Sequence, residues 1–271
     1  MAYEHPGAGA LDYAPCRYGQ SKLLFRGPRR TLEGDYVAVI GGSETYGRFV
    51  DRPFPALVEA ALGRKIVNFG YMNAGPDVFL NEAAVLDACA HAGTVVVQAM
   101  GAQNLTNRFY AVHPRRNDRF LRASALMKTI FRDVDFTEFH FTRHMLSAIR
   151  ARSPEKYRMV EDELREAWVA RMRLLLQRTG RRTVLLQVVR PEIDGDGLGP
   201  EPLFVSDAMI AEVRPLVAEV VTVAPSAEDG AEHTTGMSYA PLEAPIAERM
   251  MGPRAHETVA EALAAALDRL T

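Results

Sequence analysis

The stretch that decides the fold reads Val39-Ile40-Gly41-Gly42-Ser43-Glu44-Thr45-Tyr46-Gly47, and an apolar run over residues 36–41 leads into it. A short, nearly continuous run of Val and Ile is typical of a parallel strand covered on both faces. The glycines that follow it permit a tight turn with positive φ. The segment therefore predicts a buried strand, a turn and a helix, with Ser43 at the edge of a sheet.

Similar apolar runs recur along the chain, and helical patterns alternate with them. The runs that predict strands are 36–41, 65–69, 94–99, 183–188 and 219–223, and the segments that predict helices are 53–62, 78–90, 154–178, 206–217 and 256–270. This alternation favours an α/β fold, a three-layer α/β/α sandwich whose five parallel strands have the flavodoxin-like order 2-1-3-4-5. In such a sheet, ligands bind at the carboxyl edge of the strands.

Length and composition indicate an ordinary globular protein. The 271 residues include 48% hydrophobic and 24% charged residues, which excludes disordered and coiled-coil classes. We expect one domain over residues 1–271, with an N-terminal extension (1–34) and a basic insertion (105–152) after the third strand. The two cysteines, Cys16 and Cys89, lie far apart and outside any metal-binding or redox spacing. We therefore expect no metal and no cofactor.

The first 18 residues lack the basic start and apolar stretch of a secretory signal, and no apolar run reaches the roughly 20 residues that cross a bilayer. We expect a cytoplasmic protein that does not interact with membranes. The isoelectric point of about 6.4 and the lack of a recognisable motif argue against nucleic-acid binding. Charge is unevenly distributed, because residues 104–152 carry ten basic and four acidic side chains. That segment is suited to anions.

Small polar side chains follow three successive predicted strands. Ser43 follows the first, Asn68, Gly70 and Asn73 surround the end of the second, and Gly101-Ala102-Gln103-Asn104 follows the third. Acyl transfer requires a nucleophile and hydrogen-bond donors for the developing oxyanion, and glycine N–H groups and Asn or Gln amides are suitable donors. The alternative interpretation of the first segment is a plain turn in which Ser43 caps the helix.

These segments resemble the sequence blocks of the SGNH or GDSL-type hydrolases. Gly41-Gly42-Ser43 with Gly47 resembles the first block, Asn68-Phe69-Gly70 the second, and Gly101-Ala102-Gln103-Asn104 the third, although Gly42 replaces the aspartate of the first block. The resemblance implies Ser43 as nucleophile and as one oxyanion donor, and Gly70 as another. It places Gln103 at the position of the family's asparagine and Asn104 at that of its aspartate.

The last block of that family, Asp-x-x-His before the final helix, is only partly recognisable. His256 stands at the start of the predicted last helix and is the favoured general base, but Pro253 occupies the position of the acid. Alignment on the helix itself would instead place the histidine near Met250 and leave no base. His233 is a reserve candidate. Both alignments remain open at the level of sequence.

The insertion supplies candidates for substrate binding. Arg108, His113, Arg115 and Arg116 follow the third strand, and arginine binds phosphate, sulfate or carboxylate through two parallel hydrogen bonds. We expect these residues to lie over the site together with three residues of the turns: Glu44, Tyr46 and Asn73. A solvated basic face or a subunit interface, as in a homodimer, is the alternative interpretation.

The sequence thus predicts a serine esterase or acyl transferase that acts on an acylated, anionic carbohydrate or a related small ester. The substrate class rests on the basic insertion and on analogy with carbohydrate esterases of the family. One alternative is a non-catalytic protein of the same fold that binds an anionic glycan or a protein partner in polysaccharide biosynthesis. Another is a sulfo- or phosphoryl transferase.

Overall fold

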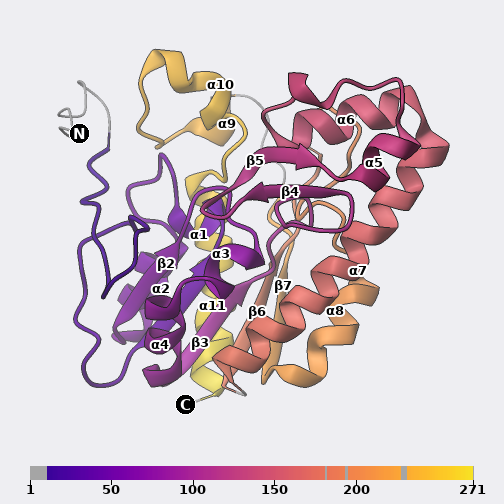
Figure 1. The fold of residues 1–271 in the computed structure, drawn as a ribbon. Helices are drawn as coiled ribbons and strands as arrows, with labels where there is room; N and C mark the ends of the chain where they lie inside the picture. The colour runs from indigo at the N-terminus through magenta and orange to yellow at the C-terminus, as the bar shows by residue number, and fades with distance from the viewer. Residues whose placement is uncertain (1–10, 181, 193–194, 227–230, 271) are drawn as a thin grey trace.

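The central sheet has five strands, all parallel, in the order β2-β1-β3-β6-β7 (Figure 1). The computed structural model describes residues 11–180, 182–192, 195–226 and 231–270. The strands are β1 (Val37–Gly41), β2 (Ile66–Gly70), β3 (Thr94–Gln98), β6 (Thr183–Val188) and β7 (Glu219–Val223). The predicted α/β class and strand order are confirmed, and each observed strand begins and ends within one residue of its predicted bounds.

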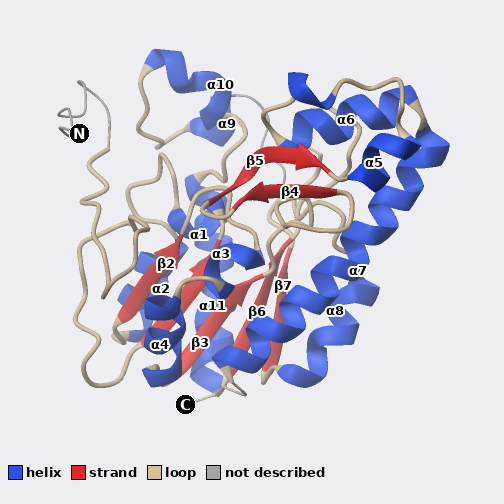
Figure 2. Ribbon diagram, viewed as in Figure 1, coloured by secondary structure: helices blue, strands red, loops and turns tan. Residues whose placement is uncertain are grey.

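Helices cover both faces of the sheet (Figure 2). On one face lie α2 (Phe54–Leu62) and α11 (Pro253–Arg269), and on the other lie α3 (Pro76–Leu80), α4 (Ala83–His91), α7 (Pro154–Thr179) and α8 (Asp207–Val213). Successive β1 side chains point to opposite faces of the sheet. Val37 and Val39 pack in the core on the face covered by α2 and α11, whereas Ala38 and Ile40 pack in the core on the other face. This two-sided burial explains the unbroken apolar run of β1.

Two predicted helices end differently from the prediction. The segment predicted as one helix over 78–90 forms α3 and α4, because Asn81 leaves the helical conformation and its side chain donates to the carbonyl of Asp77 at 2.7 Å. Helix α8 begins at the Ser206 cap, and the 3₁₀ turn η2 (Arg214–Leu216) follows it. Pro215 cannot continue an α-helix because it lacks an N–H.

The basic insertion folds as a small unit, which we call the cap (residues 105–152). It consists of the antiparallel pair β4 (Tyr110–His113) and β5 (Arg116–Ala123), helix α5 (Ala125–Ile130), the 3₁₀ turn η1 (Phe136–Glu138) and helix α6 (Thr142–Arg152). Buried Phe120, Phe131 and Phe136 join the cap to the core around α7. Figure 1 shows the cap beyond the carboxyl ends of the sheet strands.

A second connection lies at the same end of the molecule. It contains α9 (Ala231–Thr234), the 3₁₀ turn η3 (Pro241–Glu243) and α10 (Ala244–Ala247), and it leads into α11 (Figure 1). The N-terminal residues from 11 to 34 run beside β2, where Tyr18 and Phe25 pack against Phe69. Among the described residues, no helix combines the length and apolar character that crossing a membrane requires.

Candidate active site

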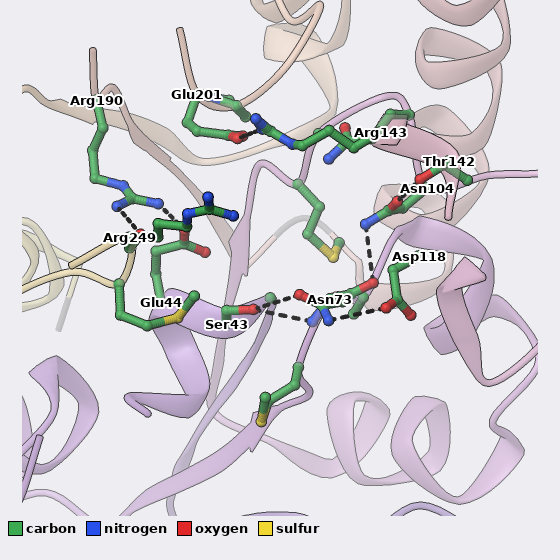
Figure 3. Close-up of a pocket in the computed structure, with 18 of the residues that line it drawn as sticks. Ser43, Glu44, Asn73, Asn104, Asp118, Thr142, Arg143, Arg190, Glu201 and Arg249 are labelled. Atoms are coloured by element: carbon green, nitrogen blue, oxygen red, sulfur yellow. Dashed lines mark hydrogen bonds and ion pairs between the residues drawn. The ribbon is translucent and has the colours of Figure 1, made fainter. Parts of the chain in front are cut away.

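A cavity of about 760 Å³ lies at the carboxyl edge of the sheet, beneath the cap. The turns after four strands, the cap and the connection before α11 all contribute to its wall (Figure 3). Its polar and charged lining residues are Ser43, Glu44, Arg48, Asn73, Gln98, Gln103, Asn104, Asp118, Thr142, Arg143, His144, Ser147, Arg190, Asp196, Glu201 and Arg249. The volume suits a small organic ligand.

The turn after β1 presents Ser43 to this cavity. Helix α1 (Ser43–Tyr46) begins directly after Gly42, whose N–H donates to Gln98 Oε1 at 3.0 Å. A Cβ at Gly41 would overlap the side chains of Thr45 and Gln98, so this close approach requires glycine. Ser43 is half-buried, and its hydroxyl lies at the cavity wall.

Asn73 makes the direct contacts with the Ser43 hydroxyl. Its backbone N–H donates to Ser43 Oγ at 3.0 Å, and Ser43 Oγ donates to Asn73 Oδ1 at 3.3 Å. Asn73 has a φ of 55°, a left-handed conformation that asparagine adopts more readily than most residues. The backbone donor at the serine oxygen is therefore Asn73, which sequence reasoning proposed only as a substrate contact.

The predicted oxyanion donor Gly70 has a different role. Its N–H donates to Asn68 Oδ1 at 2.7 Å, and it does not line the cavity. A Cβ at this position would overlap the backbone of Thr45 and Tyr46, so glycine is needed where β2 passes beneath α1. The assignment of Gly70 as a donor is therefore corrected, because its N–H is already bonded to Asn68 and the residue does not line the cavity.

Both residues predicted from the third turn reach the cavity. Asn104 Nδ2 donates to the carbonyl of Asn73 at 3.1 Å, while Asn104 Oδ1 accepts from Thr142 Oγ1 of the cap at 3.0 Å. Asn104 thus holds the Asn73 turn and ties it to the cap. Gln103 lines the cavity, and its buried Oε1 has no hydrogen-bond partner. Unsatisfied buried polar atoms are rare in folded proteins and often mark functional sites.

His256 does not act as the predicted general base in this structure. It is 1% exposed and lies between α11 and α2, where its Nδ1 accepts the Phe54 N–H at 3.1 Å and its ring stacks on that of Phe54. Burial, together with the charges of Arg26 and Arg190, lowers its pKa to about 3. The imidazole is neutral and enclosed, and it does not line the cavity.

The connection before α11 reaches the cavity. Met250 lines the cavity ahead of α11, together with Ile246 and Arg249. His233 lies outside the cavity, and its Nε2 is 2.6 Å from the carbonyl oxygen of Met250. Among the described cavity residues, His144 at the start of α6 is the only histidine.

Glu44 and Arg190 form an ion pair inside the cavity, 2.7 Å apart, with side chains that are 18% and 11% exposed. Gln98 Nε2 also donates to Glu44 at 2.8 Å. Burial alone would raise the pKa of Glu44, but the charge of Arg190 and the bond from Gln98 outweigh it and leave the pKa below its usual value. Glu44 is therefore a permanent carboxylate at neutral pH and a weak base.

The cap contacts the loop after β6 through Arg143. This arginine pairs with Asp196 at 3.0 Å and with Glu201, and burial raises the pKa of Glu201. In total the described cavity wall carries four arginines (Arg48, Arg143, Arg190, Arg249) and four carboxylates (Glu44, Asp118, Asp196, Glu201). Opposite charges therefore balance within the cavity.

The arginines predicted to bind substrate lie elsewhere. Arg108 pairs with Glu163 and Glu166 of α7, whereas Arg115 and Arg116 are exposed in the β4–β5 hairpin. His113 Nδ1 accepts the N–H groups of these two hairpin residues at 3.2 Å. None of the four lines the cavity. Their assignment to the cavity is corrected, because Arg108 is held on α7 and the two hairpin arginines are exposed to solvent.

Of the turn residues proposed as substrate contacts, Glu44 and Asn73 line the cavity and Tyr46 does not. Tyr46 packs on Tyr13, with 5.4 Å between ring centroids. Asp118 and Arg190 were missed. Asp118 is one acid within a basic segment, and Arg190 lies 146 residues from Glu44, so no spacing in the sequence links either to Ser43.

The chain belongs to the DUF6473 family, a domain of unknown function. The family model matches residues 1–271, so cap and sheet are parts of one family unit. No curated protein matches the sequence.

Proposed function

We propose that this member of the DUF6473 family is a serine-dependent esterase or acyl transferase with Ser43 as nucleophile. The observation that carries the proposal is the position of the Ser43 hydroxyl, which lines a cavity at the strand ends and receives the Asn73 N–H at 3.0 Å. A hydroxyl so placed can attack an ester carbonyl, and a donor on the cavity wall, such as the Gln103 amide, can stabilise the oxyanion that forms.

The cavity favours a neutral, hydroxyl-rich substrate over an anionic one. Its arginines face an equal number of carboxylates, so no excess positive charge is left to attract an anion. Amide, carboxylate and guanidinium groups can donate to and accept from sugar hydroxyls. Phe141 is 43% exposed at the cavity wall and offers an apolar surface. An O-acylated carbohydrate is the substrate class that we propose.

The test is hydrolysis of a panel of O-acetylated monosaccharides, measured by acetate release. Ser43→Ala should lower the rate by about 10³-fold or more, because the nucleophile is lost. Ser153→Ala is the matched control, because the Ser153 side chain makes no capping hydrogen bond to α7 and lies outside the cavity. Equal turnover by wild type and Ser43→Ala would contradict the proposal.

A second candidate is a carbohydrate-binding protein without catalysis. The observation that favours it is that Met250 and Arg249 occupy the cavity wall ahead of α11, while His256 is enclosed in the core. This candidate predicts that the same sugars raise the melting temperature of the wild type without acetate release. Acetate release that depends on Ser43 would exclude it.

A further inference from the structure

Ser43, Asn73 and Asp118 form a continuous hydrogen-bonded row along the cavity wall. Figure 3 shows the Asn73 side chain between the other two. Ser43 Oγ donates to Asn73 Oδ1 at 3.3 Å, and Asn73 Nδ2 donates to Asp118 Oδ2 at 3.2 Å. Because an ionised carboxylate can only accept, Asp118 fixes the amide with its nitrogen toward the acid and its oxygen toward the serine.

We propose that the carboxamide of Asn73 and the carboxylate of Asp118 replace the imidazole and acid of a catalytic triad and activate Ser43. This inference rests on the proposed function. In a serine triad the middle group accepts the hydroxyl proton on one side and donates its own N–H to an acid on the other. Asn73 makes both of these contacts through one planar amide.

The proton transfer balances without any further reactant. As Ser43 Oγ forms a bond to the ester carbon, its proton passes to Asn73 Oδ1, and an Asn73 Nδ2 proton passes to Asp118. Asn73 is then the imidic acid tautomer and Asp118 is a neutral acid. When the alcohol leaves, the Oδ1 proton goes to its oxygen and the Asp118 proton returns to Nδ2. Water repeats the cycle on the acyl-enzyme.

The backbone around Asn73 supports this role. The Asn73 N–H occupies one lone pair of Ser43 Oγ, so one lone pair stays available for the carbonyl carbon. Asn104 holds the Asn73 carbonyl, and Thr142 holds Asn104. The turn is therefore tied on the side away from the serine, and the amide is held in place between its two partners.

The environment of Asp118 suits a residue that accepts the proton from Asn73 Nδ2. It is half-buried on β5, and burial raises its pKa, with the charges of Arg119 and Arg116 on the same strand acting against this effect. Tyr71, in the turn after β2, interacts electrostatically with Asp118, Arg115 and Arg116. A raised pKa makes the Asp118 carboxylate a better proton acceptor than that of an exposed aspartate.

The experiment measures the second-order rate of labelling by a fluorophosphonate probe between pH 4 and 9. Asn73→Gly is the decisive variant, because glycine adopts the left-handed backbone and keeps the N–H donor while the carboxamide is lost. We expect its labelling rate to fall by about 10²-fold or more, the usual range for a general base. The labelling rate of Asp118→Asn should fall by a similar factor and should no longer rise with pH. Asp118→Glu should restore part of the rate and part of its pH dependence.

Asn73→His provides a gain-of-function arm. Histidine tolerates a left-handed backbone better than most residues, and an imidazole between Ser43 and Asp118 is a far stronger base than an amide. We expect faster labelling than in the wild type, with the acidic limb of the profile moved toward the imidazole pKa. Asp133→Asn removes an exposed cap acid that pairs with Arg152 and serves as the control.

The outcomes separate the relay from the proposed function. If Ser43→Ala abolishes labelling while Asn73→Gly and Asp118→Asn match the wild type in rate and pH profile, the relay is wrong and the esterase proposal stands. If folded wild type is not labelled at all, both are wrong. Should Asp118→Asn fail to fold, Asn73→Gly and Asn73→His still decide, because neither removes a buried charge.

Discussion

Ser43 and His256 stand at comparable places in the topology and yet have opposite environments. Ser43 follows β1, lines the cavity and exchanges hydrogen bonds with Asn73. His256 lies in the first turn of α11, is 1% exposed and accepts the Phe54 N–H. A position at the correct edge of a sheet does not by itself make a residue functional. The direction of the side chain decides whether it meets substrate or core.

The start of α11 explains the difference. The helix begins at Pro253, so His256 already lies on its inner face against α2 and the sheet. The residues that turn toward the cavity are those before the helix, such as Arg249 and Met250. The region around Ser43 is therefore polar and open, and the region around His256 is closed.

The largest expected effect on stability lies on the Ser43 side, at the ion pair of Glu44 and Arg190. Arg190→Met leaves a mostly buried carboxylate without its charge partner, which typically costs about 3–5 kcal/mol. Urea unfolding should show this loss, and Glu44→Gln in the same chain should restore part of it. The control is Arg173→Ala, which breaks an exposed pair with Glu212 and should cost less than about 1 kcal/mol. Equal costs for the two variants would contradict the account of the cavity wall.

The next effect concerns the turn that supports Ser43. Gly70→Ala places a methyl group against the backbone of Thr45 and Tyr46, and overpacking of this kind costs about 2–3 kcal/mol. Gly63→Ala is a useful comparison, because no atom lies near its Cβ position and only its left-handed backbone is strained. If Gly70→Ala is as stable as the wild type, α1 does not pack on β2 as described.

In the closed region around His256, we expect the stability of the protein to depend on pH. Its folded pKa is lowered to about 3, so the unfolded chain binds the proton first and stability falls as pH drops below about 6.5. The contribution at pH 5 is a loss of about 2 kcal/mol relative to pH 8. Thermal or urea unfolding at both pH values should show this loss in the wild type and a smaller one in His256→Gln. Identical pH dependence in the two chains would show that His256 is not enclosed.

The smallest effect is expected in the cap hairpin. Arg115→Ala with Arg116→Ala removes two exposed side chains outside the cavity. Stability should change by less than about 0.5 kcal/mol, and the KM for a neutral sugar ester should stay within about twofold. A large rise in KM would show that the hairpin arginines contact the substrate.

The sheet was predictable because its signal is local. Every residue of β1 is buried, so the strand reads as a continuous apolar run, and the turn after it requires Gly41 for steric reasons. The same local signal predicts Ser43 and Asn104 at this edge of the sheet, and both line the cavity. It did not show that the Gly70 N–H is bonded to Asn68, or that the left-handed turn at Asn73 carries the N–H that reaches the serine.

The rest of the site depends on contacts between distant segments. Asp118 reaches Asn73 only because the cap folds back over the strand ends, and Arg190 reaches Glu44 from the loop after β6. A basic segment in the sequence does not reveal which arginines pair with acids. Arg108 and Arg143 both belong to the cap, but one pairs with α7 and the other lines the cavity.

Mapping the site of covalent modification decides whether the Ser43 hydroxyl is the reactive nucleophile. The full chain is treated with a fluorophosphonate, its folding is verified by circular dichroism, and proteolytic peptides are analysed by mass spectrometry. We predict a single adduct on the peptide that contains Ser43. An unmodified folded chain, or an adduct confined to another serine, would contradict the claim.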